Sequence, residues 1–77
     1  MVKEYLAMMI KLLVDQPDQV EIREIDGNSL MVFELKVGPG DLGKVIGKKG
    51  QNARAIRTLL TAVAARTGKR AVLEIIE

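Results

Sequence analysis

Val45-Ile46-Gly47-Lys48-Lys49-Gly50, followed by an amphipathic segment from Gln51 to Thr67, is the most informative part of this sequence. Two glycines three positions apart hold two lysines between a short and a long apolar segment, which is typical of a tight link between two helices. Glycine accepts positive φ and carries no Cβ, and the first N–H groups of a helix have no partner within it. We therefore expect this loop to offer backbone donors and the charges of Lys48 and Lys49 to a phosphate.

The length of 77 residues predicts a single domain, residues 1–77, with a modest core. Tyr5 and Phe33 are the only aromatic residues, so aliphatic side chains must fill the interior. The absence of cysteine and histidine removes disulfides, thiolate metal sites and the commonest acid/base group. Because no nucleophilic or acid/base set is visible either, we expect no enzyme, no metal site and no cofactor.

Charged and polar residues divide the apolar runs into short segments. Lys11 interrupts the longest N-terminal run, and Thr61 and Arg66 divide a later one, so no run reaches the length of a membrane span. The pattern of a signal peptide is not found between Met1 and Asp18. The sequence predicts a cytoplasmic protein with no membrane partner.

The small net charge of +2 conceals an asymmetry between the two halves of the chain. Residues 1–35 contain three basic and seven acidic side chains, which gives a net charge of −4. Residues 36–77 contain nine basic and three acidic side chains, which gives +6. The basic half holds the glycine loop, so we expect a polyanionic partner on that side, although a merely solvated basic helix would give the same charge count.

The hydrophobic periodicity of the N-terminal half predicts one helix and one hairpin. Residues 2–14 have apolar positions at helical spacing, and Pro17 ends the segment. Residues 20–25 and 30–37 alternate as strands do, and the turn residues between them connect them as a hairpin with one buried face. The residues expected on the buried face of the second strand are Met31, Phe33, Leu35 and Val37.

The C-terminal half predicts two helices and a third strand. Residues 42–46 form the short helix, residues 51–67 the long one, and residues 71–76 a strand that is apolar on nearly both faces. Asp41 is expected as the N-cap of the short helix, and Gly47 ends it. At the other end of the long helix, the residues expected to cap its carbonyls are Gly68, Lys69 and Arg70.

The predicted order of elements is αββααβ, an α+β fold. We expect a three-stranded mixed sheet with three helices packed on one face. The second strand is joined to the third through two helices, so the right-handed crossover rule predicts that these two strands run parallel.

Val45-Ile46-Gly47-Lys48-Lys49-Gly50, with Ile56 downstream, resembles the signature of the KH domain, and αββααβ is the order of its type II, bacterial form. The likeness covers almost the whole chain. The short length, the helix that ends near Pro17, and the segments from Gly43 to Gly50 and from Ala55 to Leu60 are similar to the stand-alone bacterial KH proteins called KhpA.

This resemblance implies single-stranded RNA as the ligand, with the G-x-x-G loop clamping the backbone of about four nucleotides. It also implies self-association, pairing with a larger KH-containing protein called KhpB, and a role as an RNA chaperone that influences cell length and envelope growth. Ala53 departs from the family pattern, which often has a larger aliphatic residue there, and this leaves base preference open.

The candidate site combines the loop with the helices on both sides of it. Each part has a simpler interpretation: the glycines as helix cap and turn, the basic side chains as solvated groups, and Val45 and Ile46 as core. The near-absence of aromatic residues fits bases resting on aliphatic surfaces and argues against aromatic stacking platforms. The candidate RNA-binding residues are Lys44, Val45, Ile46, Gly47, Lys48, Lys49, Gly50, Arg54 and Arg57.

Two alternative functions remain open from the sequence. A helix-turn-helix DNA-binding protein would use Gln51, Asn52 and Arg54 to read the major groove from the start of the long helix. A protein-association adaptor would instead use the methionine-containing N-terminal helix and the apolar third strand as its interface, with RNA contact secondary.

Overall fold

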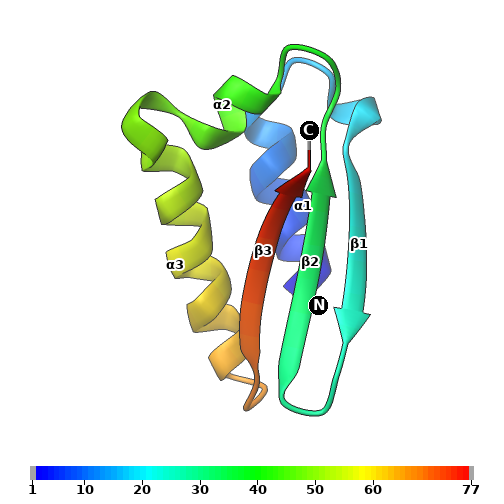
Figure 1. Cartoon of the computed structure of the whole chain (residues 1–77), viewed down its shortest axis with the longest axis vertical. Coiled ribbons are helices and arrows are strands. Elements are labelled where there is room, and N and C mark those ends of the chain that lie inside the picture. Colours follow the sequence, from blue (N-terminus) through cyan, green and yellow to red (C-terminus); the bar gives the residue numbers. More distant parts are fainter. Residues whose placement is uncertain (1, 77) are drawn as a thin grey trace.

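The computed structural model describes residues 2–76, which form three α-helices and a three-stranded sheet (Figure 1). None of the described helices combines the length and the hydrophobicity of a membrane span. The elements are α1 (Val2–Leu13), β1 (Glu21–Asp26), β2 (Leu30–Lys36), α2 (Leu42–Ile46), α3 (Gln51–Ala65) and β3 (Arg70–Ile76), with 3₁₀ turns at Pro17–Gln19 (η1) and Lys48–Gly50 (η2).

The sheet has the order β1-β2-β3, with β2 in the centre. β1 and β2 form the antiparallel hairpin, in which Ile22 pairs with Leu35. β2 and β3 run parallel, in which Phe33 pairs with Leu73. The predicted mixed sheet and the parallel crossover through α2 and α3 are therefore confirmed.

The core lies between the helices and one face of the sheet. The side chains predicted to face inward from β2 do so: Phe33 and Leu35 are fully buried, and Met31 is 7% exposed. Each of the three α-helices contributes residues to the same cluster, so the helices and the inner face of the sheet share one core. The main members of this cluster are Val2, Leu6, Ile10, Phe33, Leu35, Val45, Ile56, Leu60 and Leu73.

β1 is less buried than its alternating sequence predicts. Only Ile22 is partly covered, on the core side, whereas Ile25 lies opposite Val32 and is 46% exposed. β1 is an edge strand, so it has a neighbouring strand on one side only. Its exposed acidic residues discourage pairing with another chain at this edge.

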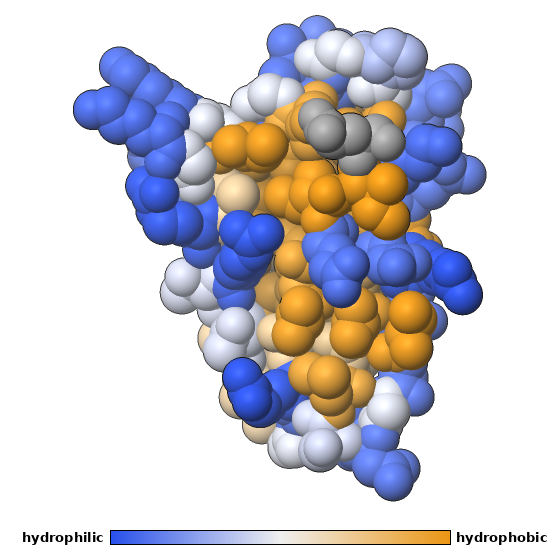
Figure 2. Space-filling model, viewed as in Figure 1, coloured by the Kyte–Doolittle hydropathy of each residue, from blue (hydrophilic) through white to orange (hydrophobic). Residues whose placement is uncertain are grey.

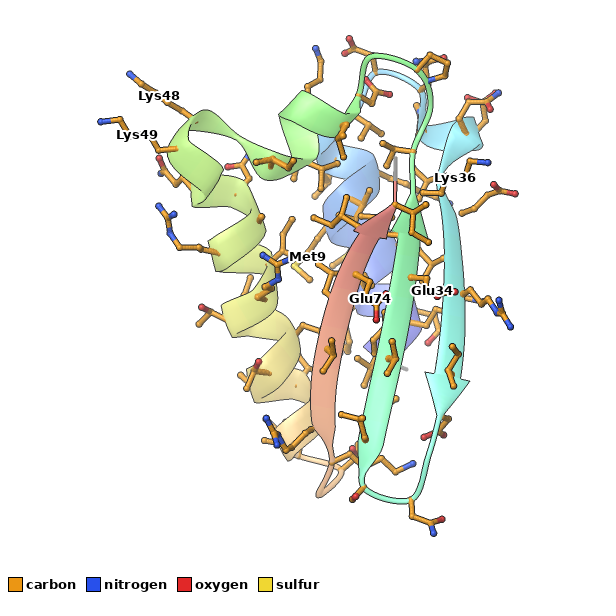
Figure 3. All side chains as sticks on the ribbon, in the orientation of Figure 1. Met9, Glu34, Lys36, Lys48, Lys49 and Glu74 are labelled. Atoms are coloured by element: carbon orange, nitrogen blue, oxygen red, sulfur yellow. The ribbon has the colours of Figure 1, made fainter. Side chains whose placement is uncertain are left out.

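The second face of the sheet carries no helix, and it forms the front of the molecule in Figure 1. Figure 2 shows apolar side chains over much of this open face, crossed by a band of polar ones. The band corresponds to the row Arg23, Glu34 and Glu74, two of which are labelled in Figure 3. Exposed apolar residues flank this row on the strands: Ile25, Leu30, Val72 and Ile76.

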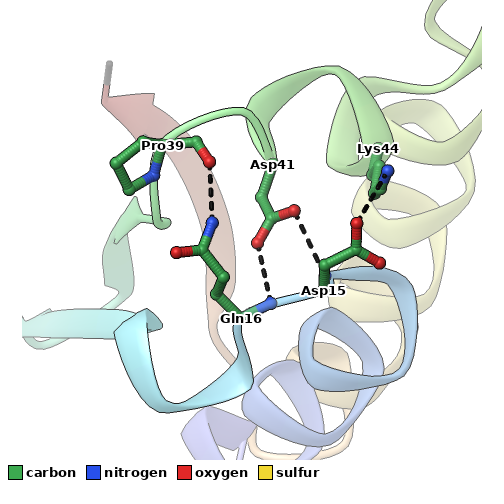
Figure 4. Close-up of polar contacts among 5 residues, drawn as sticks. All are labelled: Asp15, Gln16, Pro39, Asp41 and Lys44. Carbon is green, nitrogen blue, oxygen red and sulfur yellow. Dashed lines mark hydrogen bonds and ion pairs between the residues drawn. The ribbon is translucent and has the colours of Figure 1, made fainter.

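Asp41 does not cap α2 as predicted, although it occupies the N-cap position. Its side chain is 1% exposed, and the carboxylate accepts hydrogen bonds from the backbone N–H groups of Asp15 at 3.2 Å and Gln16 at 3.0 Å (Figure 4). The Gln16 side chain in turn donates to the carbonyl of Pro39 at 2.7 Å. Asp41 therefore connects the end of α1 to the start of α2 and fixes the position of the segment that leads into the loop.

The C-terminal end of α3 is closed by backbone hydrogen bonds. Gly68 has a φ of 77°, its N–H donates to Ala65, and the N–H of Lys69 donates to Ala64, which is the Schellman arrangement. The prediction that the Lys69 side chain caps these carbonyls is wrong. Its Nζ instead donates to Oδ1 of Asp26 at 2.6 Å, because the turn between β1 and β2 lies beside the end of α3.

Candidate nucleic-acid interface

The loop between α2 and α3 has the glycine geometry that the sequence predicts. Gly47 has φ 75° and ψ 176°, a region open essentially to glycine alone, and its N–H closes α2 by donating to the carbonyl of Gly43 at 2.8 Å. Gly50 has φ 74° and ψ 14°, and its N–H donates to the carbonyl of Gly47 at 3.1 Å. The two glycines thus form the corners of a tight turn.

Lys49 also has a left-handed conformation, which the sequence did not reveal. Its φ is 56° and its ψ is 27°, and among residues 2–76 it is the one residue other than glycine with positive φ. A residue with a Cβ rarely adopts this backbone conformation unless neighbouring groups stabilise it. The support comes from contacts with α3.

The N–H groups of Lys48 and Lys49 point out of the turn. In a trans peptide, the C=O and the N–H point in opposite directions. The carbonyls of Gly47 and Lys48 accept hydrogen bonds from Gly50 and Gln51 inside the turn, so the N–H groups on the far side of these two peptides face outward. No acceptor contacts them within the described part of the chain. Successive free N–H groups of this kind form a binding site for an anion.

The side chains of Lys48 and Lys49 are exposed and extend away from the molecule at the same corner (Figure 3). Neither has an acidic partner among residues 2–76. The sequence between residues 42 and 73 contains no aspartate or glutamate. The corner therefore combines free donors with positive charge that no nearby carboxylate neutralises.

Two side chains from the first turn of α3 hold the backbone of this corner. Asn52 Nδ2 donates to the carbonyl of Lys44 at 2.9 Å, and Arg54 Nη1 donates to the carbonyl of Lys49 at 2.7 Å. Sequence reasoning missed the role of Asn52, since an amide at this position gives no signal of its partner. The helix-turn-helix alternative receives no support here, because two of its three proposed base-reading residues are bound to the backbone.

The three candidate residues on α2 have different surroundings. Lys44 is 44% exposed in its side chain and forms an ion pair with Asp15, with Nζ 3.1 Å from Oδ2 (Figure 4). Val45 is fully buried, so the structure favours its interpretation as core over a cleft-lining side chain. Ile46 is partly exposed beside the loop.

Arg57 connects α3 to the edge of the sheet. Its Nη2 donates to the carbonyl of Leu73 on β3 at 3.4 Å. An open groove lies between the two elements. The residues that line this groove are Arg57, Leu60, Thr61, Ala71, Val72 and Leu73.

The structure therefore brings most of the predicted residues together but assigns them different tasks. Lys48 and Lys49 are free to bind a ligand. Arg54 and Lys44 are already engaged, one by the loop backbone and one by an acidic side chain. Arg57 lines the groove between α3 and β3 and is also engaged, by the carbonyl of Leu73.

Comparisons with known proteins agree with this geometry. A family model described as "KhpA/KhpB, KH domain" matches residues 3–75. The chain is 48% identical to RNA-binding protein KhpA of Chlamydia trachomatis and 52% identical to the protein of the same name from Aquifex aeolicus, each over 75 residues. These alignments cover 97% of this chain and 96% and 95% of the two relatives.

The fold is also similar to one part of Aquifex aeolicus Era, in a crystal structure bound to GDP.AlF4-. The TM-score is 0.64 and the sequence identity is 21%, and the likeness covers 96% of this chain and 29% of the Era chain. Since the family match and the relatives near half identity both extend along nearly the whole sequence, the chain belongs to the KhpA/KhpB family of KH domains.

Proposed function

We propose that this chain is a non-enzymatic RNA-binding protein that clamps the backbone of single-stranded RNA with the loop Gly47–Gly50. The observation that carries the proposal is the corner at Lys48 and Lys49, where two outward N–H groups lie beside two unpaired ammonium groups. Phosphate is the group in RNA that such a corner binds best. The relatives named RNA-binding protein KhpA support the same ligand.

In this proposal, the bases of the bound strand lie along the groove between α3 and β3. This groove is lined by aliphatic residues, such as Ala71 and Val72, together with Arg57 and Thr61, and by no aromatic ring. Arg57 lines the groove and has guanidinium N–H groups in addition to the one bonded to Leu73, and Ile46 offers apolar surface beside the loop. These groups fit contacts with base edges and sugars, whereas the loop supplies contacts that are independent of sequence.

The wider role follows from the family. We propose a cytoplasmic RNA chaperone that acts with a KhpB-like partner in post-transcriptional control of cell length and envelope growth. Its support is the resemblance to KhpA and the name of the family model, which covers both KhpA and KhpB.

Charge reversal at the corner tests the clamp. In the variant Lys48→Asp with Lys49→Asp, binding of a fluorescent oligouridine should be lost, because phosphate meets two carboxylates in place of two ammonium groups. Folding should change by only about 0.5 kcal/mol, since both side chains are exposed. The matched control replaces the exposed α1 residues Lys3 and Lys11 with Asp, an equal change in charge away from the corner.

Two results would refute the clamp: equal affinity of the loop variant and the wild type, or equal loss in the α1 control. Salt dependence gives a second measure, because each phosphate neutralised on a single strand contributes a slope of roughly 0.7 in log affinity against log salt. Competition by duplex DNA should be weak. Duplex DNA that competes as well as single-stranded RNA would restore the helix-turn-helix alternative.

A second proposal, association through apolar side chains, has its own observation. Leu12 is 80% exposed, Met8 55% and Leu59 53%, on the helical side of the molecule away from the open sheet face. A groove between α1 and α3 runs beside Leu12 and Leu59. We propose that this surface serves a homodimer or a heterodimer with a KhpB-like protein. Light scattering over a range of concentrations tests self-association, and Leu12→Glu should reduce it.

A further inference from the structure

We propose that Asn52 and Arg54 are positioning residues, which hold the loop Gly47–Gly50 in the conformation that binds phosphate. This inference rests on the proposed RNA-binding function, and it changes the role predicted for Arg54 from ligand contact to support of the loop. Three observations carry it. They are the packing of Asn52 on Gly47, the hydrogen bond from Arg54 to Lys49, and the orientation of the peptide groups from Gly47 to Gly50.

Asn52 fixes the side of the loop that joins α2. Its Nδ2 donates to the carbonyl of Lys44 in the last turn of α2, at 2.9 Å. The same side chain packs directly on Gly47, since a Cβ added to Gly47 would lie 2.7 Å from Cγ of Asn52 and 2.9 Å from its Cβ. Asn52 thus sets the spacing between the two helices, and the absence of a side chain at Gly47 permits this close contact.

Arg54 fixes the side of the loop that joins α3. Lys49 has a left-handed conformation, which is unfavourable for a residue with a Cβ. Arg54 Nη1 donates to the carbonyl of Lys49 at 2.7 Å, a short charge-assisted bond, and also lies near Gly50, where an added Cβ would be 3.3 Å away. No other side chain donates to the backbone of Lys49 within residues 2–76.

The hydrogen bond from Arg54 influences the outward N–H of Lys48 indirectly, by fixing the orientation of the peptide groups between them. It orients the peptide between Lys49 and Gly50, whose N–H must point the opposite way, toward the carbonyl of Gly47. The bond at Gly47 orients the next peptide, whose N–H belongs to Lys48 and points outward. The guanidinium therefore acts on the anion site without contacting the anion.

Direct phosphate binding by Arg54 makes a different prediction from positioning. A cation that neutralises phosphate adds to the salt dependence of binding, by roughly 0.7 in the logarithmic slope. A cation that holds the backbone leaves this slope unchanged, while its loss disturbs the loop in the protein without RNA. The two roles are separated by measuring both quantities in the same variant.

The test uses Arg54→Met, which removes the donor and the charge but keeps a long side chain, and Asn52→Ala, which removes the other bond. The control is Arg66→Met, the same change at an exposed site near the end of α3. Affinity for fluorescent oligouridine is measured at several salt concentrations. Amide NMR and hydrogen exchange of Lys48, Lys49 and Gly50 are recorded for each protein without RNA.

We expect Arg54→Met to weaken oligouridine binding about tenfold, equivalent to one charge-assisted hydrogen bond, with an unchanged salt slope. The amide signals of the loop should shift and exchange faster in the Arg54 and Asn52 variants without RNA, and not in the Arg66 control. An unchanged loop spectrum, or a salt slope lower by about 0.7, would overturn positioning by Arg54. If the wild-type chain fails to bind oligouridine, the proposed function fails, whereas the loop spectra still test the positioning.

Discussion

The two ends of α3 contain the same types of residue but differ in whether those residues have partners within the protein. Each end has a glycine with positive φ and a lysine next to it: Gly50 with Lys49 at the start, and Gly68 with Lys69 at the finish. At the finish, backbone bonds satisfy the last turn, and Lys69 binds Asp26. At the start, two N–H groups and two ammonium groups remain without partners among the described residues.

This difference shows that a glycine and a lysine beside a helix end do not make a binding site by themselves. The surrounding chain decides whether their donors and charges are used internally. The turn between β1 and β2 supplies Asp26 to Lys69, whereas no acidic residue lies between positions 42 and 73 to reach Lys48 or Lys49. Substitutions of the glycines and lysines near the two ends test this interpretation.

The largest effect is expected for Gly47→Ala, at the open end. A Cβ would lie within 3 Å of the side chain and backbone N of Asn52, in a conformation reserved for glycine, so the loop must rearrange. The free energy of unfolding should fall by about 2–3 kcal/mol, and oligouridine binding should fall more than tenfold. Urea denaturation and fluorescence anisotropy measure the two quantities. Retained affinity would show that the loop geometry is not needed.

The next effect concerns the free lysines. Replacing Lys48 and Lys49 with Met keeps their length and removes their charge. The salt slope of oligouridine binding should fall by about 1.4, which is two phosphate contacts at roughly 0.7 each, with the stability almost unchanged. Affinity titrations at several salt concentrations check this result, and an unaltered slope would mean that neither lysine meets a phosphate.

Gly68→Ala makes the same change at the closed end, where Gly68 ends α3 as Gly47 ends α2. Gly68 has a φ of 77°, but no atom lies within 4 Å of an added Cβ. The cost is the backbone strain alone, about 1 kcal/mol in the free energy of unfolding. RNA affinity should not change. A loss of affinity similar to that of Gly47→Ala would remove the distinction between the two ends.

The smallest effect is expected for Lys69→Met, the counterpart of the free lysines. It breaks the ion pair with Asp26, whose groups are both partly solvated, so the free energy of unfolding should fall by about 0.5 kcal/mol. The salt slope of RNA binding should equal that of the wild type. A reduced slope would place Lys69 at the nucleic acid after all.

Local patterns were enough to predict most of the fold. Helical and alternating spacing reflect which side of an element is buried, and so the inward positions Phe33 and Leu35 follow from the sequence alone. The positive φ at Gly47 and Gly50 was also predictable, because glycine is the residue that adopts it readily.

Contacts between distant residues were not predictable in this way. Asp41 stands at a position in the sequence that is typical of a helix N-cap. Its carboxylate nevertheless accepts hydrogen bonds from the backbone N–H groups of Asp15 and Gln16, because the packing of α1 beside α2 brings them together. The burial of Val45 was not predictable for the same reason. An apolar residue next to a loop can face either a cleft or the core, and the position of α2 in the fold places Val45 in the core.

The location of the loop within the crossover between β2 and β3 has a kinetic consequence. Leu30 pairs with Arg70, so these parallel strands cannot meet until the intervening chain, with both helices and the loop, has become compact. Closing so long a segment is slow compared with forming a hairpin or a helix. In a refolding experiment, competence to bind RNA should therefore appear together with the final pairing of the sheet, and not in an earlier phase.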